Sequence, residues 1–566
     1  MWVAPFLRMR ACPSSWTRVG ALSATALAIA CGDSSPADPT TDGGAGDSSS
    51  VQDGAVVTDA APPSSCEPFG HYPAPQNTFT LPITNGSLAI GDVQKAFPAV
   101  DWTTLDRLYI PAGKYKQLNL TNFPTRDAKR PLIITNLGGQ VQVGPPGDGS
   151  NYVWAMGGGS NWILTGRYDP DAKTGDVGFP GHRCGAYATS RGKYGFFSDD
   201  AYAKGQYSHM GLAVGDATDF ELEFVEVTRA GFAGIRLLNS RTANDPARPM
   251  ANVRVHDTYV HDSASEAFYF GWTGAPPGNM LPNLQVYNNR LIRSGSEGLQ
   301  IQDLGDKTHV HHNTVAFNAL HWLDNFGNYQ DGASQVHTRE GNIELDHNVV
   351  VGGAGTFLSL FSAPEGADGA RNVTLHDNYF ADTRSLGGYL NGTSTAPSSI
   401  TLLGNYFRGL DFAYTAVDPA AKDPGVVFGM NSGGLKGPIL FDGNHWEGNR
   451  AIVSGMGPDQ VKGNVTTKGN VNAPVPVLAF IASGYPDVPT ARLSAWGAKA
   501  TLAPGQPAIS YASGDLVMED GEMYRARTTS TNLLPPDHPE AWEKLPLPSD
   551  DVRVVANSPY AGYGVQ

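Results

Sequence analysis

The segment 283–303, NLQVYNNRLIRSGSEGLQIQD, determines which fold the chain can adopt. It contains two short runs in which apolar and polar residues alternate, one around Leu284 and Val286 and one around Leu299 and Ile301. Asn, Ser and Gly separate the two runs. Such runs are typical of β-strands and are too short for a helical repeat. We therefore expect strands whose apolar side chains face inward and whose polar side chains face outward.

The first half of this segment recurs from about residue 220 onward. The recurring units are VHDT (255–258), VYNN (286–289), VHHN (310–313), LDHN (345–348), LHDN (375–378), LLGN (402–405) and FDGN (441–444). A period of about thirty residues with variable insertions predicts a solenoid of stacked coils. Stacked Asn side chains can take a bend conformation and hydrogen-bond along the solenoid axis. We interpret the last residue of each unit as structural: Thr258, Asn289, Asn313, Asn348, Asn378, Asn405 and Asn444.

With this repeat, residues 78–480 resemble the right-handed parallel β-helix proteins of the pectate-lyase-like superfamily. The resemblance implies an all-β fold, a single-stranded right-handed parallel β-helix over residues 67–500. The segment 90–100, IGDVQKAFPAV, predicts an N-terminal cap helix. Superfamily members include lyases, hydrolases, epimerases and adhesins, so the resemblance leaves the activity open. The motifs of polygalacturonases and of the best-known pectate lyases do not occur in the sequence.

Residues 1–31 are typical of a bacterial export signal, because three arginines precede the uncharged run ALSATALAIA (21–30) and Cys31. The run resembles a lipoprotein signal, which implies lipidation of Cys31; ordinary cleavage or a retained anchor are the alternatives. Residues 32–66 have almost no apolar side chains and are expected to form a disordered tether. We expect an exported protein, either an outer-membrane or cell-surface lipoprotein or an extracellular protein. Cys66 and Cys184 then form a disulfide or remain separate thiols.

The C-terminal segment 508–548 breaks the repeat. Its frame resembles the small chitin-binding-type carbohydrate-binding modules of families 5 and 12, which implies a small all-β module that binds sugar through Tyr511, Tyr524 and Trp542. The frame lacks the Trp that usually precedes Tyr511 and the aromatic cluster that usually follows Tyr524. Residues 549–566 resemble a terminal β-helix coil, which would make the module an insertion.

The charge balance limits the partners. The chain has 54 acidic and 39 basic residues, a net charge of −15 and no basic run, which argues against nucleic acid as a partner. Neutral polymers, or anionic polymers held through a cation, remain compatible with this charge. We expect a monomer that binds a polysaccharide and contacts a membrane only through an N-terminal lipid.

The alternation predicts a groove on one outward face. Arg236, Tyr269, Gln300 and Gln302 are expected to be neighbours on successive coils. The loop from 321 to 339 adds further polar and aromatic side chains: Trp322, Asn325 and Tyr329 as sugar-binding residues, and His337 and Arg339 for proton transfer and carboxylate recognition. Such a mixture is what a sugar groove requires, although a solvated irregular face is the alternative.

Two glutamates, Glu266 and Glu297, occupy equivalent positions in successive coils and are expected at the same corner. They can bond the backbone, hold a cation such as Ca²⁺, or act as the carboxylate pair of a retaining glycosidase. His309, His311 and His312 lie in one strand, where alternation would send His309 and His311 to one side and His312 to the other. This favours a polar outer strand face over a metal cluster.

The leading hypothesis is a polysaccharide lyase that acts on an acidic glycan. β-Elimination needs charge neutralisation at the uronate carboxylate, by Ca²⁺ or Arg, and a base at the adjacent carbon. Arg236, Tyr269, His337 and Arg339 are the residues that can supply these roles. The nearest alternative is a glycoside hydrolase that uses Glu266, Glu297, Asp324 or Asp331. A non-catalytic surface adhesin is the third hypothesis, which the predicted anchor and tether favour.

Overall fold

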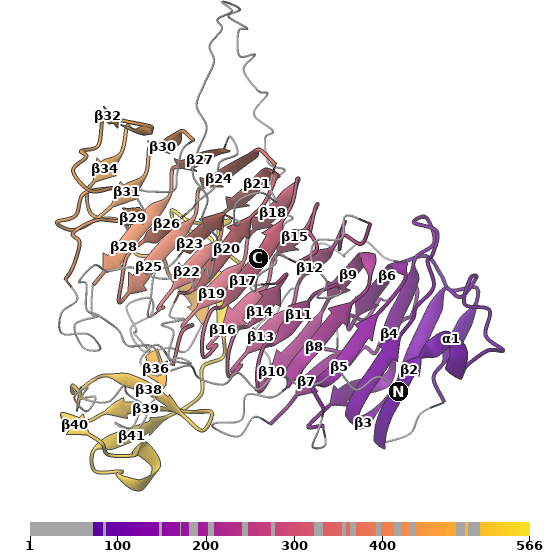
Figure 1. Cartoon of the computed structure of the whole chain (residues 1–566). Coiled ribbons are helices and arrows are strands. Elements are labelled where there is room, and N and C mark those ends of the chain that lie inside the picture. The colour runs from indigo at the N-terminus through magenta and orange to yellow at the C-terminus, as the bar shows by residue number, and fades with distance from the viewer. Residues whose placement is uncertain are drawn as a thin grey trace, which may run out of the picture.

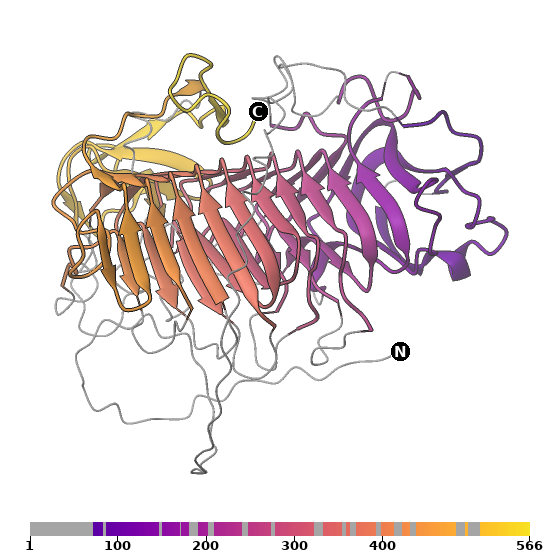
Figure 2. The same ribbon diagram turned by 90° about the horizontal axis from the view of Figure 1, so that it is seen from above.

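The computed structural model describes residues 72–82, 86–146, 150–169, 171–179, 191–201, 209–239, 247–272, 278–321, 332–353, 358–362, 369–391, 398–411, 422–430, 437–482, 493–495 and 510–566. Thirty-four strands, β1 to β34, form one continuous sheet that winds into a parallel β-helix (Figure 1). Strands three apart in sequence order pair in parallel, for example Phe268 beside Leu299. Each turn of chain therefore contributes one strand to each of three faces, which we name sheets A, B and C. In Figure 2 the strands of neighbouring coils lie side by side along the axis.

The strands of the three sheets are short. Sheet A contains β2 (Gly86–Asp92), β5 (Tyr152–Gly157), β8 (Met210–Gly215), β11 (Ile235–Leu237), β14 (Phe268–Phe270), β17 (Leu299–Leu304), β20 (Ser334–Thr338), β23 (Leu358–Ser362), β26 (Gly388–Asn391) and β29 (Phe428–Met430). Sheet B contains β1 (Thr78–Thr80), β6 (Ser160–Thr165), β9 (Thr218–Glu223), β12 (Arg254–His256), β15 (Gln285–Tyr287), β18 (Thr308–His311), β21 (Gly341–Asp346), β24 (Arg371–His376), β27 (Ser398–Leu403), β30 (Ile439–Asp442), β32 (Gln460–Lys462) and β33 (Val465–Lys468). Sheet C contains β7 (Phe196–Asp199), β10 (Val225–Thr228), β13 (Tyr259–His261), β16 (Arg290–Ile292), β19 (Thr314–Ala316), β22 (Val349–Val351), β25 (Tyr379–Thr383), β28 (Tyr406–Leu410), β31 (His445–Trp446) and β34 (Val471–Asn472).

Two longer strands begin the helix. β3 (Arg107–Thr121) pairs with strands of sheets A and B, and β4 (Leu132–Val143) pairs with strands of sheets B and C. The helix α1 (Val93–Ala96) precedes them at the N-terminal end, where Val93 is buried and Asp92 caps the first turn by accepting a hydrogen bond from Lys95 N. The expected cap helix is therefore present, but it is a single turn long.

The interior of the coils is apolar, as the alternation predicts. The side chains of Val255, Phe268, Phe270 and Val286 are fully buried in one continuous core that runs along the axis. Burial of such side chains is the main stabilising contribution of each coil, at about 1.5–3 kcal/mol per large side chain. Because parallel strands alternate, the residues between these positions face outward.

The corner between sheets B and C is held by a ladder of asparagines. Asn348 donates from Nδ2 to Val310 O of the preceding coil at 2.8 Å and to Asn378 Oδ1 of the next coil at 3.0 Å. The same bonds recur at Asn289, Asn313, Asn378, Asn405 and Asn444, and Asn470 continues the ladder. The structural interpretation of these residues is confirmed.

The bend itself is made by a different residue from the one expected. The residue before each ladder position has a positive φ, including Asp257 at 52°, His312 at 53° and Gly404 at 63°. Asp, Asn, His and Gly at these positions tolerate the left-handed conformation to different degrees, and glycine does so without strain. The ladder Asn therefore supplies hydrogen bonds, and its predecessor supplies the bend.

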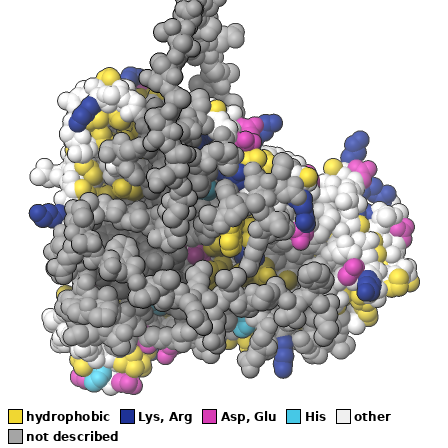
Figure 3. Space-filling view, in the orientation of Figure 1, with side chains coloured by type: hydrophobic (Ala, Val, Ile, Leu, Met, Phe, Trp, Pro, Cys, Tyr) yellow, Lys and Arg dark blue, Asp and Glu magenta, His cyan; other side chains and the backbone are white. Residues whose placement is uncertain are grey.

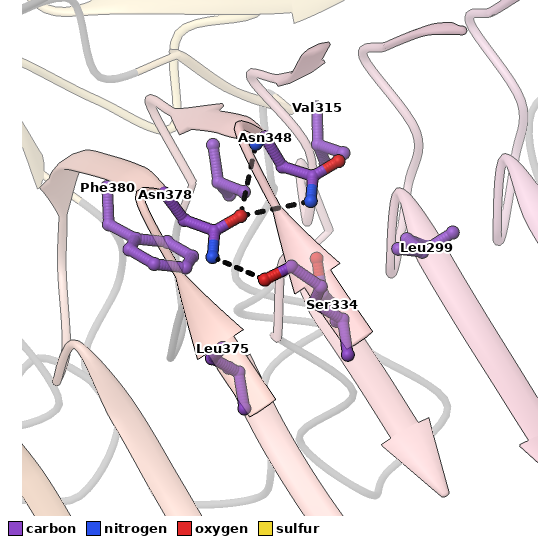
Figure 4. Close-up of a pocket in the computed structure, with 9 residues that line it drawn as sticks. Leu299, Val315, Ser334, Asn348, Leu375, Asn378 and Phe380 are labelled. Atoms are coloured by element: carbon purple, nitrogen blue, oxygen red, sulfur yellow. Dashed lines mark hydrogen bonds between the residues drawn. The ribbon is translucent and has the colours of Figure 1, made fainter. Parts of the chain in front are cut away.

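A small cavity of about 20 Å³ lies inside the coils beside this ladder, large enough for about one water molecule (Figure 4). Asn348 and Asn378 reach it from the corner, and apolar side chains form the rest of its wall. The wall residues are Leu299, Val315, Ser334, Leu345, Val350, Leu375 and Phe380. The cavity lies among core residues, and its volume is far too small for a sugar polymer.

The C-terminal segment forms a small module. β36 (Leu493–Ala495), β38 (Leu516–Glu519), β39 (Glu522–Ala526) and β41 (Trp542–Leu545) form one sheet, and β37 (Ser510–Tyr511) pairs with β40 (Ser530–Thr531). A short 3-10 helix, Pro535–Asp537, precedes β41. β36 was expected inside the β-helix, whose predicted limit was residue 500, but it pairs with β38 of the module instead.

Residues 549–566 do not form the expected terminal coil. β42 (Asp551–Val554) pairs antiparallel with β35 (Phe480–Ala482), outside the large sheet. The chain then runs back over the outer face of sheet C, and its end lies over the middle of the helix (Figures 1 and 2). Val565 N donates to Thr314 Oγ1 at 3.0 Å. The apolar residues of this tail belong to one buried cluster with outward residues of sheet C, so the segment is a strap and not a coil.

Asp550 anchors the strap. Arg293 donates to both of its carboxylate oxygens at 2.6 and 2.8 Å, Arg191 lies at 3.1 Å, and Tyr259 also donates to it. Burial alone would raise the pKa of Asp550, but the charges of Arg293 and Arg191 lower it to about 2.

No helix of the described residues is long and apolar enough to cross a membrane.

Candidate functional site

The outward face of sheet A contains a row of polar side chains. Arg236 on β11 pairs with Tyr269 on β14, which pairs with Gln300 on β17 and then Gln335 on β20. Each side chain of the row faces outward because core residues flank it, such as Ile235 and Leu237 beside Arg236. Strands of a sheet lie about 4.8 Å apart, so these side chains stand next to one another in one row. The row predicted from Arg236, Tyr269 and Gln300 is present, and Gln335 extends it.

The side chains of this row are mostly covered, with Tyr269 8% and Gln300 2% exposed. The ring of Phe232 lies 5.9 Å from the ring of Tyr269. Gln300 Oε1 is buried and has no hydrogen-bond partner among the described residues. Gln302 lies beyond the row, at a point where the pairing of β17 with β20 shifts register. Its place next to Gln300 is therefore less regular than alternation alone predicts.

Glu266 and Glu297 occupy the same corner of adjacent coils, where the chain enters sheet A. Ala267 N donates to Glu297 O at 3.0 Å, which fixes the two residues in register. Both side chains are buried, and Gln335 donates from Nε2 to Glu297 Oε1. Glu266 Oε2 has no hydrogen-bond partner among the described residues. Burial raises the pKa of the Glu266 carboxyl above its ordinary value.

A second polar group lies at the opposite end of β17. Asp303 accepts a hydrogen bond from Trp272 N at 2.8 Å, and Arg339 Nη1 lies 3.5 Å from its carboxylate. Burial raises the pKa of Asp303 to about 6, although these contacts oppose the shift. His337 faces the same place, with its Nδ1 3.5 Å from Asp303 N.

Arg339 is therefore not a surface residue of the groove. The strand β20 ends at Thr338, so Arg339 lies past the alternating segment, and its side chain is fully buried. Its Nη1 donates to Gly278 O at 2.7 Å and faces Asp303. The prediction that Arg339 recognises a substrate carboxylate is wrong, because an internal carboxylate holds its guanidinium.

A histidine that sequence reasoning missed lies two coils before Glu266 on the same corner. Phe232 N donates to His209 O at 2.8 Å, and Ser265 N donates to Phe232 O at 3.3 Å, which aligns the three coils. His209 Nδ1 lies 2.9 Å from Asp200 Oδ1. No spacing signal in the sequence identifies this His–Asp pair.

Several predicted residues lie outside the described residues. They are the sugar-binding residues Trp322, Asn325 and Tyr329, the alternative acids Asp324 and Asp331, the lipidation residue Cys31, and Cys66 and Cys184 of the predicted disulfide. Their predictions remain as stated.

The three module aromatics are not a sugar-stacking surface. Tyr511, Tyr524 and Trp542 are 5%, 7% and 2% exposed and form the module's own core. The rings of Tyr511 and Trp542 meet edge to face at 5.3 Å, and Trp542 Nε1 donates to Leu533 O at 2.9 Å. Because stacking on a sugar requires an exposed ring face, their predicted role in substrate binding is wrong.

The charged side chains in view on the described surface are dispersed. Figure 3 shows Lys and Arg side chains scattered singly, several of them beside Asp or Glu, without a broad basic patch on the described part of this face.

No protein family profile matches the sequence, and no curated protein matches it. Among solved structures, the chain is similar to an alginate lyase from Paenibacillus sp. strain FPU-7, at 13% identity and a TM-score of 0.38, over 58% of this chain and 96% of that one. It is also similar to a lacto-N-biosidase of family GH136 from Eubacterium ramulus, at 10% identity and a TM-score of 0.38, over 70% and 68% of the two chains. A third similar structure is pectate lyase Pel9A, at 12% identity and a TM-score of 0.32, over 67% and 73%. Likenesses this distant assign no activity.

Proposed function

We propose that the protein is an exported polysaccharide lyase that binds an acidic glycan along the outward face of sheet A. The observation that carries the proposal is the pair Arg236 and Tyr269 on adjacent strands of that face. A guanidinium is suited to a uronate carboxylate, and a phenol beside it can exchange a proton with the sugar ring. Gln300 and Gln335, next in the row, offer amides to the neighbouring hydroxyl groups.

The proposed reaction is β-elimination. A base removes the proton from the ring carbon next to the carboxylate, the bond from the neighbouring carbon to the glycosidic oxygen breaks, and a carbon–carbon double bond forms. The leaving oxygen takes up a proton. In this proposal Arg236 stabilises the negative charge that develops on the carboxylate, and Tyr269 exchanges the proton.

We further propose that Ca²⁺ binds at the corner of Glu266 and Glu297. A hard cation takes carboxylate and amide oxygens, and the donor set fits, because Glu266 Oε2 and Gln300 Oε1 are buried without a partner among the described residues. When bound there, Ca²⁺ would contribute positive charge for an anionic polymer. The residues' own contribution is to place two carboxyl groups at one corner of adjacent coils, with the amide of Gln300 on the strand that follows Glu297.

The test is an assay of the mature protein on uronic-acid and neutral polysaccharides, with and without chelator. A lyase produces ultraviolet absorbance from an unsaturated sugar end. Tyr269→Phe should then reduce kcat by about 10²–10⁴-fold while the protein stays folded. Tyr287→Phe is the matched control, because Tyr287 lies on sheet B, where its ring stacks between His256 and His311, and it should leave kcat unchanged. Absence of the unsaturated product on all acidic glycans would refute the proposal.

A second candidate function, a glycoside hydrolase, rests on Glu266 and Glu297 themselves. Adjacent strands bring the two carboxyl groups to roughly the 5 Å separation of retaining glycosidases. Burial raises the pKa of Glu266, as a general acid requires. This function predicts new reducing ends without ultraviolet absorbance, and loss of them in both Glu266→Gln and Glu297→Gln. Under the lyase proposal these variants instead lose only the stimulation by Ca²⁺.

A further inference from the structure

The outer face of sheet B contains a cluster of imidazoles and carboxylates. It lies on a different face of the coils from the polar row of sheet A. Its members come from three successive coils: His309 on β18, Glu344 and Asp346 on β21, and His376 on β24, with His347 in the bend after β21. Ligand atoms of Glu344, Asp346 and His376 lie within 4.8 Å of one another. Because these residues come from three different strands, the sequence of a single strand contains only part of the cluster.

Asp346 is the centre of the cluster. His309 Nε2 contacts its Oδ1, and His347 Nδ1 lies 2.7 Å from its Oδ2, so each carboxylate oxygen faces one imidazole. His376 Nε2 lies 2.9 Å from Glu344 Oε1. Asp346 is 2% exposed, whereas the side chain of His309 is 30% and that of Glu344 51% exposed. The cluster is therefore anchored at a buried carboxylate and open to solvent on its other side.

The histidine pattern differs from the one predicted by alternation. The rings of His309 and His311 stack at 4.1 Å on the outer face, as expected. His312 was expected on the opposite side, but it occupies the left-handed bend, and its Nδ1 lies 2.8 Å from His311 Nδ1. The bend therefore returns His312 to the same surface. The polar outer face also contains more imidazoles than the strand with His309 and His311 alone predicts, because His347 and His376 lie on the following coils.

The same sheet contains an equivalent cluster that is closed. Glu221 and Glu223 on β9 face His256 on β12 in the register that relates Glu344 and Asp346 to His376. There, Arg254 donates to Glu221 at 3.0 Å and Tyr72 donates to Glu223. Both nitrogens of His256 are taken, by Glu221 at 2.9 Å and by Asp257 at 2.6 Å. His376 has the equivalent contacts, to Glu344 at 2.9 Å and to Asp377 at 3.0 Å, so the two clusters differ in the residues around this histidine.

The open cluster lacks the guanidinium that bonds Glu221 in the closed one. Thr374 stands where Arg254 stands in the closed one, so no guanidinium neutralises Glu344 at that position. His309 adds an imidazole where the closed cluster has no counterpart on the preceding coil, because β6 places Ile163 beside Glu221. The same register therefore produces two different clusters on sheet B. In one, an arginine bonds the glutamate; in the other, imidazole and carboxylate atoms face solvent.

We infer that His309, Glu344, Asp346 and His376 bind a divalent transition-metal ion such as Zn²⁺ on the outer face of sheet B. Two imidazoles with two carboxylates are a donor set for Zn²⁺, Cu²⁺ or Ni²⁺ and a poor one for Ca²⁺. Tetrahedral Zn²⁺ with bonds near 2.1 Å needs donors about 3.4 Å apart. The ligand atoms of Glu344, Asp346 and His376 lie within 4.8 Å of one another, and His309 contacts Asp346, so binding requires these side chains to close around the ion. His347 then holds the second oxygen of Asp346 and orients it.

The test is isothermal titration calorimetry of the untagged full chain with ZnCl₂, with CaCl₂ as the second titrant. We expect one Zn²⁺ per chain, with no competition from Ca²⁺. Asp346→Asn and His309→Ala/His376→Ala should weaken Zn²⁺ binding by about 100-fold or more, and Glu344→Gln by about tenfold. Glu344 is exposed, so that variant remains informative if the buried Asp346 variant does not fold.

Two further variants make the test specific. Thr374→Arg copies the closing residue of the equivalent cluster and should weaken Zn²⁺ binding by about tenfold without touching a ligand. His538→Ala removes an exposed histidine that pairs with Glu540 at 2.9 Å in the module, and should leave binding unchanged. Zn²⁺ uptake that survives Asp346→Asn, Glu344→Gln and Thr374→Arg, as uptake by the cysteines would, overturns the inference. So does the absence of binding in the folded protein.

Discussion

Individual side chains in this chain are predictable where alternation alone sets their direction. Arg236, Tyr269 and Gln300 face outward in one row because every second residue of a strand faces the core. Arg339, Tyr511 and Trp542 are polar or aromatic in the same way, yet Arg339 faces an internal carboxylate, and Tyr511 and Trp542 form the core of the module. Their positions depend on which element covers them, and a single-strand pattern does not contain that information.

His256 provides a test at the same scale. Burial would lower its pKa, but hydrogen bonds to Asp257 and Glu221 raise it to about 10. A raised histidine pKa stabilises the fold fully below the unfolded pKa of about 6.5, and this contribution is lost as the pH rises through about 10. We expect His256→Gln to lower the free energy of unfolding at pH 6 by about 3 kcal/mol, as loss of a buried ion pair does. The difference between variant and parent should shrink towards pH 10, as urea unfolding at several pH values would measure; a constant difference would contradict it.

At the scale of elements, the repeat unit predicted the Asn ladder. It did not predict that the residue before each Asn, and not the Asn itself, adopts the left-handed conformation of the bend. The spacing of Asn289, Asn313 and Asn348 identified the corner, because identical residues recur at it. The left-handed residue before each Asn varies among Asp, Asn, His and Gly, so it leaves no repeated letter in the sequence. The strap escaped prediction for a related reason, since its contacts are made to coils more than two hundred residues earlier.

The ladder predicts a sharp difference between its interior and its end. Asn378 donates to Leu345 O and to Asn405 Oδ1, both at 2.9 Å, and accepts from the coil before it. Asn378→Ala should therefore lower the free energy of unfolding by about 2–4 kcal/mol, because buried groups on both neighbouring coils lose partners. Asn472→Ala, at an exposed position beyond the ladder, should change it by less than about 0.5 kcal/mol. Equal effects in denaturant titrations would contradict the ladder's role.

At the scale of the whole molecule, the strap joins the module, the last coils and the middle of the helix. Asp550 accepts from Arg293 and Tyr259, and Tyr560 packs on the ring of Tyr379 at 4.5 Å. The apolar cluster under the strap continues into Leu516 and Met523 of the module. The sequence predicted a β-helix and a small module as separate segments, and the strap is the element that connects them.

Asp550→Asn should release the strap. Loss of the buried ion pairs should cost about 3 kcal/mol and make residues 549–566 sensitive to limited proteolysis. Because its pKa is lowered to about 2, the contribution of Asp550 is present above about pH 4 and is lost as the pH falls through 2. Asp537→Asn, at an exposed position of the module, is the control and should cleave like the parent. A strap that resists protease equally in Asp550→Asn would show that apolar packing alone holds it.

A stack of coils, each of which touches only its neighbours, can in principle fray from its last coil inward. The strap changes the order of that process, because its final residues are bonded to Asn288 and Thr314 in the middle of the stack. The coils between β16 and β34 are thereby enclosed in a loop that must open at the chain's end before any of them can peel away. We expect unfolding to begin with release of the strap, so that the lifetime of the native state is set by the contacts of residues 549–566.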